Sequence, residues 1–261
     1  TSISNTIYSD VDINAYKFLY TLYMRTFMKL SCLISDKTIA ISEFTKKDII
    51  KRFNINPNKI EVIYEAVEKK FKPIQEEQIL NTVKNKYQLQ IPFIFFCGSL
   101  SPRKNLKRIL KAFNRVKDDI SHNLYLTGND EWEDPELIEL INSDLKNRVK
   151  ILGYVSEEEL IALYSMADLY LYPSLYEGFG LPILEAQACE TPVLTSNTTS
   201  CAEIANDSAI LVNPESIEDI AHEIRKAIKD DKYKKLLVKR GKSNIKRFSW
   251  QKTAENILSL I

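Results

Sequence analysis

The sequence has few of the residues that bind metals or serve as nucleophiles. Its 261 residues include only four cysteines and two histidines. The cysteines Cys32, Cys97, Cys189 and Cys201 show no spacing that is typical of a metal site. Because Cys97 and Cys189 lie within apolar segments, we expect buried free thiols in a reducing compartment. The sequence therefore predicts no metal site.

Neither sign of charge is in excess, and long apolar runs are absent. The 36 basic and 35 acidic residues leave a net charge of +1, whereas nucleic-acid-binding proteins usually carry a basic excess. We therefore expect no nucleic-acid partner. No apolar run approaches the roughly 20 residues that span a membrane, and no signal peptide is visible. Gly-x4-Gly-Lys-Ser and Gly-x-Gly-x-x-Gly loops are also missing, which argues against a P-loop enzyme and a dinucleotide-dependent oxidoreductase.

Short apolar segments alternate with amphipathic ones over most of the chain, and 44% of the residues are hydrophobic. The apolar segments predict strands over residues 92–97, 123–126, 149–152, 167–172, 192–194 and 209–212. The segments between them predict helices, among them residues 76–87, 135–145, 157–166, 217–228 and 232–246, with a last helix over 251–260. A Ser/Thr/Asn-rich loop is expected through Ser200. Such alternation predicts a doubly wound parallel α/β sheet.

The front of the chain carries a smaller set of elements. Strands are expected over residues 37–41 and 60–63, and Ser42 is a candidate N-cap for a helix between them. Before them, a helix over residues 13–33 has an apolar stripe of Tyr16, Tyr20, Tyr23, Phe27 and Leu30, with Lys17, Arg25 and Lys29 among them. A basic amphipathic helix can rest on a membrane surface. Packing against a sheet is commoner, and we favour it.

The most informative stretch is Pro173-Ser-Leu-Tyr-Glu-Gly-Phe-Gly-Leu-Pro-Ile-Leu-Glu185. It connects an expected strand to an expected helix, where the free N–H groups of the first turn favour an anion. Gly178 and Gly180 allow the backbone to approach a ligand closely. Since phosphate repels carboxylates, Glu177 and Glu185 suit sugar hydroxyls, and the stretch predicts a ligand with diphosphate and polyol parts. Alternatively, Glu177 is a solvated loop residue and Glu185 complements its helix dipole.

A second strand-to-helix turn is Gly98-Ser-Leu-Ser-Pro-Arg-Lys-Asn105. Arg103 and Lys104 lie at the carboxyl end of a strand. There the guanidinium of Arg103, with its two parallel N–H donors, and the compact ammonium charge of Lys104 can hold a diphosphate. The alternative is that both cations are solvated surface residues. Asn105 is a candidate cap for the next helix. A third turn follows at residues 153–155.

The stretch 173–185 resembles the E-x7-E motif of retaining GT-B glycosyltransferases of the GT4 type, the group 1 family, with a likeness to its mannosyltransferases. Residues 98–105 resemble the Gly-x-Leu-x-x-Arg/Glu-Lys-Asn loop of this family. The turn at Ser42 and the strand at residues 60–63 resemble the end of its acceptor-side domain. The resemblance covers the chain from about residue 40 to residue 261.

This resemblance implies a GT-B fold with a complete C-terminal Rossmann-like doubly wound sheet and the tail of an N-terminal Rossmann-like domain. Residues 1–72 would be the remnant of the acceptor-side domain and the linker. Residues 73–243 would form the donor domain, and residues 244–261 a helix that crosses back to the N-terminal domain. The first part of the N-terminal domain is expected to be missing.

The resemblance also implies roles for individual residues. Arg103 and Lys104 would bind the diphosphate, Glu177 would face the transferred hexose, and Glu185 would accept the ribose hydroxyls, with Glu177, Arg103 and Lys104 as the catalytic set. The other expected donor-binding residues are Gly98, Ser99, Tyr154, Val155, Phe179, Gly180 and Leu181. The last three would act through backbone N–H groups. Tyr154 would stack on the base or simply pack at the strand edge.

The expected partners are a UDP- or GDP-sugar as substrate and a glycan or lipid-linked acceptor in surface polysaccharide synthesis. No cofactor and no metal are implied. We expect a cytoplasmic protein, with peripheral contact at the inner membrane surface as an open alternative. The family usually supplies a histidine near the sugar, and neither His122 nor His222 fits that role, so both are expected to be structural or exposed. A nucleotide-sugar-binding fragment or regulatory module without turnover is the competing hypothesis.

Overall fold

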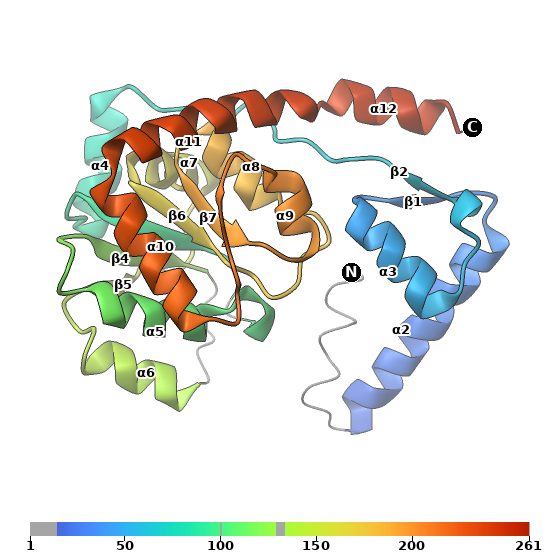
Figure 1. Ribbon diagram of the computed structural model, residues 1–261, viewed down its shortest axis with the longest axis horizontal. Helices are drawn as coiled ribbons and strands as arrows, with labels where there is room; N and C mark the ends of the chain where they lie inside the picture. Colours follow the sequence, from blue (N-terminus) through green and yellow to red (C-terminus); the bar gives the residue numbers. More distant parts are fainter. Residues whose placement is uncertain (1–14, 100, 129–133, 261) are drawn as a thin grey trace.

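The structure is a computed structural model that describes residues 15–99, 101–128 and 134–260, with the backbone alone for residues 15–20. Its larger lobe is built on a six-stranded parallel sheet (Figure 1). The strands are β3 (Phe93–Cys97), β4 (Asn123–Thr127), β5 (Val149–Ile151), β6 (Leu169–Tyr172), β7 (Val193–Ser196) and β8 (Ile210–Val212). Their spatial order is β5-β4-β3-β6-β7-β8, so the order reverses between the neighbours β3 and β6. Ligands bind at such switch points in doubly wound sheets.

Helices cover both faces of this sheet. One face packs against α5 (Leu106–Val116), α6 (Pro135–Asn142) and α10 (Ile217–Lys229), and the other against α4 (Glu77–Tyr87), α7 (Glu157–Met166), α8 (Leu181–Ala188) and α9 (Thr199–Ala205). Because side chains alternate along a strand, Ile94 and Phe96 enter the first core and Phe93 and Phe95 the second. The doubly wound parallel sheet predicted from the sequence is confirmed.

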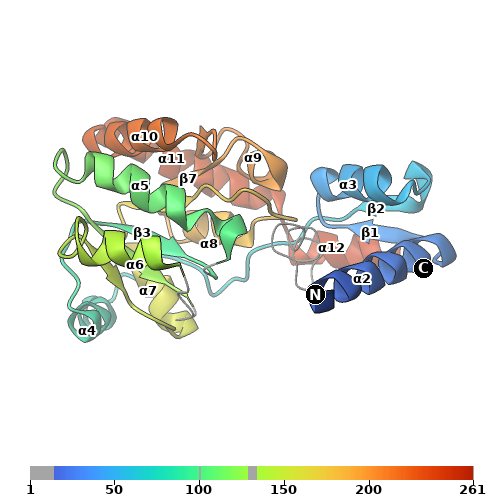
Figure 2. The same cartoon turned by 90° about the horizontal axis from the view of Figure 1, so that it is seen from below.

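The smaller lobe contains two short parallel strands, β1 (Thr38–Ala40) and β2 (Ile60–Val62). Figure 2 shows α2 (Ala15–Ile34) and α3 (Glu43–Phe53) on either side of them. Our expectation for the stripe on α2 is wrong in this structure, because Tyr23, Phe27 and Leu30 are each about half exposed. Strands of three residues cannot cover the stripe, and the side of α2 that carries Cys32 joins the small core instead.

The end of the chain lies along the linker between the lobes. After α11 (Asp231–Asn244), α12 (Trp250–Leu258) extends over the smaller lobe (Figure 1). The Thr253 hydroxyl donates to the Tyr64 carbonyl at 2.7 Å. The ring of Phe248 packs edge-on against Tyr64 and Phe179. These contacts connect the last helix to the linker and to the loop after β6.

Two local predictions differ from the structure. Asn105 lies at the N-cap position of α5, but its side chain does not cap the helix. Where a loop was expected through Ser200, the helix α9 begins at Thr199. The prediction that Ser42 caps α3 is confirmed. Ser156 likewise begins α7, in a full capping box with Glu159.

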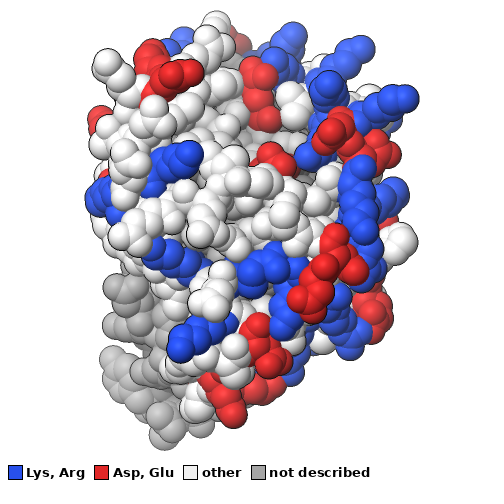
Figure 3. Space-filling model, turned by 90° about the vertical axis from the view of Figure 1, so that its left-hand side faces the viewer, with Lys and Arg blue, Asp and Glu red and all other residues white. Residues whose placement is uncertain are grey.

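Charged residues of both signs share the outer surface of the larger lobe. Figure 3 shows the end of this lobe that faces away from α3. Lys and Arg side chains lie along its edges with Asp and Glu side chains among them, and its centre is mostly uncharged. Among the helices of the described residues, none combines the length and the apolar content that a membrane crossing requires.

Candidate functional site

The loops after β3 and β6 meet at the switch point of the sheet. The first contains the short helix η3 (Pro102–Lys104), and the second runs from Pro173 to the start of α8. The Leu175 N–H donates to the Arg103 carbonyl at 2.8 Å. The buried Asn105 amide donates to the carbonyls of Pro173 at 2.9 Å and Pro214 at 2.7 Å. The side chain expected to cap α5 therefore joins the loops after β3, β6 and β8.

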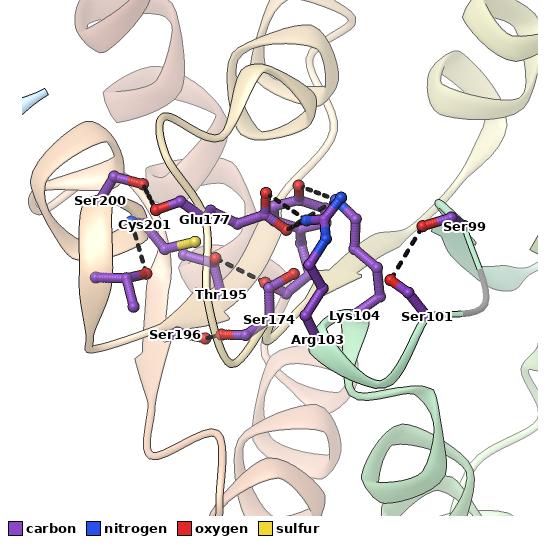
Figure 4. A network of polar contacts seen from close by, with 12 residues as sticks. Ser99, Ser101, Arg103, Lys104, Ser174, Glu177, Thr195, Ser196, Ser200 and Cys201 are labelled. Atoms are coloured by element: carbon purple, nitrogen blue, oxygen red, sulfur yellow. Dashed lines mark hydrogen bonds and ion pairs between the residues drawn. The ribbon is translucent and has the colours of Figure 1, made fainter. Parts of the chain in front are cut away.

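Arg103, Lys104 and Glu177 form a compact ion cluster between these loops (Figure 4). The Arg103 Nη1 lies 2.9 and 3.0 Å from the two carboxylate oxygens of Glu177, and the Lys104 Nζ lies 2.8 Å from Oε1. Lys104 and Glu177 are each only 7% exposed. Figure 4 shows the two cations extending from one loop and the carboxylate reaching them from the other. The cluster keeps one positive charge in excess.

One nitrogen of this cluster has no partner among the described residues. The Nε of Arg103 is buried and makes no hydrogen bond there. Buried polar groups are normally satisfied, and leaving one unpaired costs free energy. An acceptor supplied by a ligand would satisfy this nitrogen.

Glu185 lies on α8 in a largely buried environment. Burial raises the pKa of its carboxyl group to about 7, although the hydroxyl of Tyr164, which donates to Oε2 at 3.2 Å, acts in the opposite direction. The charge of Lys104 also lowers the pKa of Glu185, so this cation acts on both glutamates. A further hydrogen-bond donor from a ligand would stabilise the ionised form of this carboxyl group.

The backbone before α8 turns sharply. Gly180 has φ of 109°, and a Cβ there would lie 3.2 Å from the Ile183 Cδ1, so glycine is required. The side chain of Phe179 is buried against Leu184 and Phe248. Within the described residues, no acceptor takes the backbone N–H groups of Phe179, Gly180 or Leu181. These groups remain available to an anion at the helix N-terminus.

The smaller lobe contacts this same loop. The hydroxyls of Ser42 and Thr45, at the start of α3, both donate to the Gly178 carbonyl, at 2.6 and 2.9 Å. The carboxylate of Glu203 on α9 accepts from the N–H groups of Glu43 and Phe44. From the sequence, Ser42 was predicted as a cap and as part of the turn that resembles the family, but no site role was predicted for Ser42, Thr45 or Glu203.

The α9 segment holds the loop from the other side. The Ser200 hydroxyl donates to the Glu177 carbonyl at 2.8 Å (Figure 4). The backbone of Glu177 and Gly178 is thus bonded to α9 and α3, while the Glu177 carboxylate is bonded to the cations. The position of this acid is fixed from three directions.

The remaining predicted residues lie around this centre. Gly98 donates through its N–H to the Thr127 carbonyl at 3.1 Å, and Ser99 is exposed with its hydroxyl 3.2 Å from that of Ser101. Tyr154 is 82% exposed after β5, whereas Val155 is buried. The expected site residues thus come from the loops after β3, β5 and β6, all at the carboxyl edge of the sheet. Residue 100 of the first loop lies outside the described residues.

The histidines lie elsewhere, as expected. His122 precedes β4, at the opposite edge of the sheet, and its Nε2 lies 2.9 Å from the Asp168 carboxylate. His222 is exposed on α10, with Glu223 at 3.7 Å. In the part of the chain that the structure describes, no three potential His, Cys, Asp or Glu ligands come together.

Known structures share this fold. A glycosyltransferase from Rickettsia africae ESF-5 gives a TM-score of 0.78 at 24% identity, over 91% of this chain and 66% of that chain. Alr3699/HepE from Anabaena, solved in complex with UDP and glucose, gives 0.80 at 21% identity, over 90% and 65%. The fold is the GT-B type of glycosyltransferases, with a six-stranded parallel sheet and a smaller two-stranded one.

Sequence comparison defines the family. Residues 80–244 match the glycosyl transferases group 1, and residues 7–71 match glycosyltransferase family 4. The O-antigen chain mannosyltransferase B of Escherichia coli is 34% identical over 217 residues, which are 82% of this chain and 57% of that protein. The chain belongs to the group 1 glycosyltransferase family, and it spans little more than half the length of this relative.

Proposed function

We propose that this chain carries the donor site of a glycosyltransferase and that the site binds a UDP- or GDP-sugar. The observation that carries this proposal is the ion cluster at the switch point, where Arg103 and Lys104 hold Glu177 with one positive charge to spare. A diphosphate prefers such a place, since a guanidinium fork, an ammonium group and free N–H groups at a helix N-terminus all favour it.

The sugar part of the donor would meet the two glutamates. When the diphosphate takes over Arg103 and Lys104, the carboxylate of Glu177 becomes free to accept hydroxyls of the hexose. Glu185 accepts the ribose hydroxyls, and Tyr154 stacks on the base. A nucleotide donor is also supported by the related fold of Alr3699/HepE, whose structure contains UDP and glucose.

The proposed reaction is transfer of a hexose, with retention, to a glycan or lipid-linked acceptor. The bond between the anomeric carbon and the diphosphate oxygen breaks, the acceptor oxygen bonds to that carbon, and the proton of the acceptor hydroxyl passes to the leaving diphosphate. Negative charge grows on the leaving diphosphate, where Arg103, Lys104 and the α8 N-terminus stabilise it without a metal. The likeness to an O-antigen mannosyltransferase supports a role in surface polysaccharide synthesis.

We place this activity in the cytoplasm, with peripheral contact at the inner membrane surface. The support for this contact is the exposed apolar side of α2, which carries Tyr23, Phe27 and Leu30. An amphipathic helix of this kind can lie in the membrane interface.

A thermal-shift panel of UDP-, GDP- and ADP-sugars tests the donor site. A ligand that binds the folded chain alone raises its apparent stability. We expect sugars of UDP or of GDP to raise the melting temperature and ADP-sugars to have no effect. A panel without any shift contradicts the proposal.

Binding without turnover is a second candidate function, and one observation favours it. Among the described residues, neither His122 nor His222 lies near the cluster, although the family resemblance implies a histidine near the sugar. A donor-hydrolysis assay on this chain, followed by a transfer assay on a chain of the relatives' full length, distinguishes the two. Hydrolysis or transfer supports the enzyme, and tight donor binding with neither supports the binding module.

A further inference from the structure

Three buried tyrosines form a continuous layer beneath the candidate site. Tyr170 and Tyr172 are two residues apart on β6, so their side chains lie on the same face of the sheet. Tyr164 of α7 packs beside them on that face. The ring centroids of Tyr164 and Tyr170 are 5.0 Å apart, and those of Tyr170 and Tyr172 are 5.9 Å apart. None of the three is more than 1% exposed. A core position normally favours an apolar side chain, because a buried hydroxyl is costly unless it is hydrogen-bonded.

Two of these hydroxyls are bonded to side chains of the candidate site. The Tyr172 hydroxyl accepts a hydrogen bond of 2.5 Å from the Lys104 Nζ, which also lies 4.5 Å from the centre of its ring. The Tyr164 hydroxyl donates to the Glu185 carboxylate at 3.2 Å. The Tyr170 hydroxyl, between them, donates instead to the backbone carbonyl of Cys97 at 3.1 Å.

We propose that Tyr164 and Tyr172 are positioning residues of the donor site, whose buried hydroxyls hold the Glu185 carboxylate and the Lys104 ammonium in place. This inference rests on the proposed function, because it takes Glu185 as the ribose acceptor and Lys104 as a diphosphate ligand.

The hydrogen-bonding capacity of both site residues agrees with this role. An ammonium group has three N–H donors, and Lys104 uses one on Tyr172 and one on Glu177, so one remains for a phosphate oxygen. A carboxylate has about four acceptor positions, so Glu185 can bind Tyr164 and still accept ribose hydroxyls. Fixing a flexible lysine before the ligand arrives reduces the entropy lost on binding.

The tyrosines keep their protons. Burial raises the pKa of Tyr164, Tyr170 and Tyr172 well above the usual value. The Tyr164 hydroxyl therefore remains a donor to Glu185 at any pH where the protein is studied. Because a donor favours the ionised carboxylate, removing this hydroxyl should raise the pKa of Glu185 above its present value of about 7.

Other charged and titratable groups also surround Glu185 and are all retained in a Tyr164 variant. They are Glu157 of α7, Glu68 of the linker, Lys104 of η3, Cys97 of β3, Tyr170 of β6 and Cys189 at the end of α8. A shift caused by Tyr164 alone is therefore measured against an unchanged background.

The test compares Tyr164→Phe, Tyr172→Phe and the control Tyr170→Phe, each of which removes one buried hydroxyl. The first readout needs no ligand. Carboxyl-carbon NMR of the chain labelled at glutamate, with the Glu185 signal assigned through Glu185→Gln, follows the titration of this group. Tyr164→Phe should raise the pKa of Glu185, and Tyr170→Phe should leave it unchanged. If Tyr164→Phe does not fold, Tyr164→Met removes the same hydroxyl with a more adaptable side chain.

The second readout is calorimetric binding of UDP and GDP beside uridine and guanosine. Tyr172→Phe should weaken binding of the diphosphates about three- to tenfold, the range of one hydrogen bond, without affecting the nucleosides. Tyr164→Phe should weaken both, most strongly at low pH and less as Glu185 ionises. Tyr170→Phe should behave as the wild type.

The inference is overturned for Glu185 if Tyr164→Phe leaves its pKa unchanged, and for Lys104 if Tyr172→Phe binds diphosphates as the wild type does. Equal effects from Tyr170→Phe overturn both parts, since they would show a general packing effect. If the wild type binds neither UDP nor GDP, the proposed function fails, while the ligand-free titration still decides the role of Tyr164. If the wild type binds and Tyr164→Phe changes nothing, only the positioning inference fails.

Discussion

At the scale of single residues, Glu177 occupies the cations that a diphosphate would need. Its carboxylate lies within 3.0 Å of both Arg103 and Lys104, where little solvent reaches. Coulomb attraction in such surroundings is several times stronger than in bulk water. A diphosphate, with more charge than one carboxylate, can displace Glu177, but it must compete with this acid. If the proposed donor site is correct, this resident carboxylate should lower the affinity for free nucleoside diphosphate.

Replacing Glu177 with glutamine should separate binding from transfer. Glu177→Gln keeps the shape of the side chain and removes the competing charge, so UDP or GDP should bind about three- to tenfold more tightly. Transfer should fall, since the sugar loses its carboxylate acceptor. Calorimetry and a turnover assay measure both. Glu190→Gln is the control, because Glu190 pairs with Lys242 on the outer surface. Unchanged or weaker diphosphate binding in Glu177→Gln contradicts the competition.

Glu185 predicts a specific dependence on pH. The pKa of Glu185 is about 7 in the folded chain, whereas an unperturbed glutamate in the unfolded chain has a pKa of 4.5. Between these two pH values the folded state therefore binds more protons than the unfolded state. The free energy of unfolding should therefore fall as pH rises through this window, by at most about 3 kcal/mol. Ribose hydroxyls favour the ionised carboxylate, so donor affinity should instead rise with pH up to and beyond about 7.

The matching variant is Glu185→Gln, in which both pH dependences should become flatter. Chemical denaturation from pH 4 to 8 follows stability, and calorimetry follows donor affinity. For Glu185→Ala, which also removes the acceptor, we expect a loss of about 1–3 kcal/mol in donor binding. Donor affinity that is the same in both variants and the wild type would exclude Glu185 from the site.

At the scale of elements, the sequence predicted most strands and helices of the larger lobe and the edge of the sheet where the site lies. The alternation of apolar and amphipathic segments carries that information locally. It does not reveal that Glu177 pairs with cations more than 70 residues away. Nor does it reveal that the Asn105 amide joins three loops, because a side chain at a cap position is expected to bond its own helix.

The helix α9 shows why local patterns fail in other places. Its Thr, Ser and Cys residues are weak helix formers. Its helical form depends on packing, since Cys201, Ile204 and Ala205 are fully buried against the larger lobe. The same helix presents Glu203 to the N-terminus of α3, where an anion is favourable. Tertiary contacts therefore override propensity at this element.

The N-caps of α3 and α10 allow a matched experiment. Ser42→Ala and Ser216→Ala each remove a cap and should lower the free energy of unfolding by about 1 kcal/mol. Ser42 also donates to the Gly178 carbonyl at the site, whereas the Ser216 hydroxyl accepts from the Asp219 N–H in the first turn of its own helix, away from the site. Donor affinity should consequently fall in Ser42→Ala alone. Equal donor affinity in the two variants would show that α3 does not support the site loop.

At the scale of the whole molecule, the site lies where both lobes and the last helix come together. The loop after β6 contacts α3 through Gly178 and packs through Phe179 against Phe248, which precedes α12. Movement of the smaller lobe would therefore reach the loop that carries Glu177. The chain spans 57% of the length of its E. coli relative, so a longer chain would add residues to this arrangement.

The most direct test is calorimetric titration of the wild type and Arg103→Ala with UDP and GDP at low and high salt. The control is Arg240→Ala, because Arg240 of α11 pairs with Asp207 rather than with any residue of the site. We expect the wild type to bind one of these nucleotides, with an affinity that falls as salt rises, and Arg103→Ala to lose about 1.5–3 kcal/mol of binding free energy at low salt. Arg240→Ala should match the wild type. Binding of Arg103→Ala that equals that of the wild type at both salt concentrations would contradict the account.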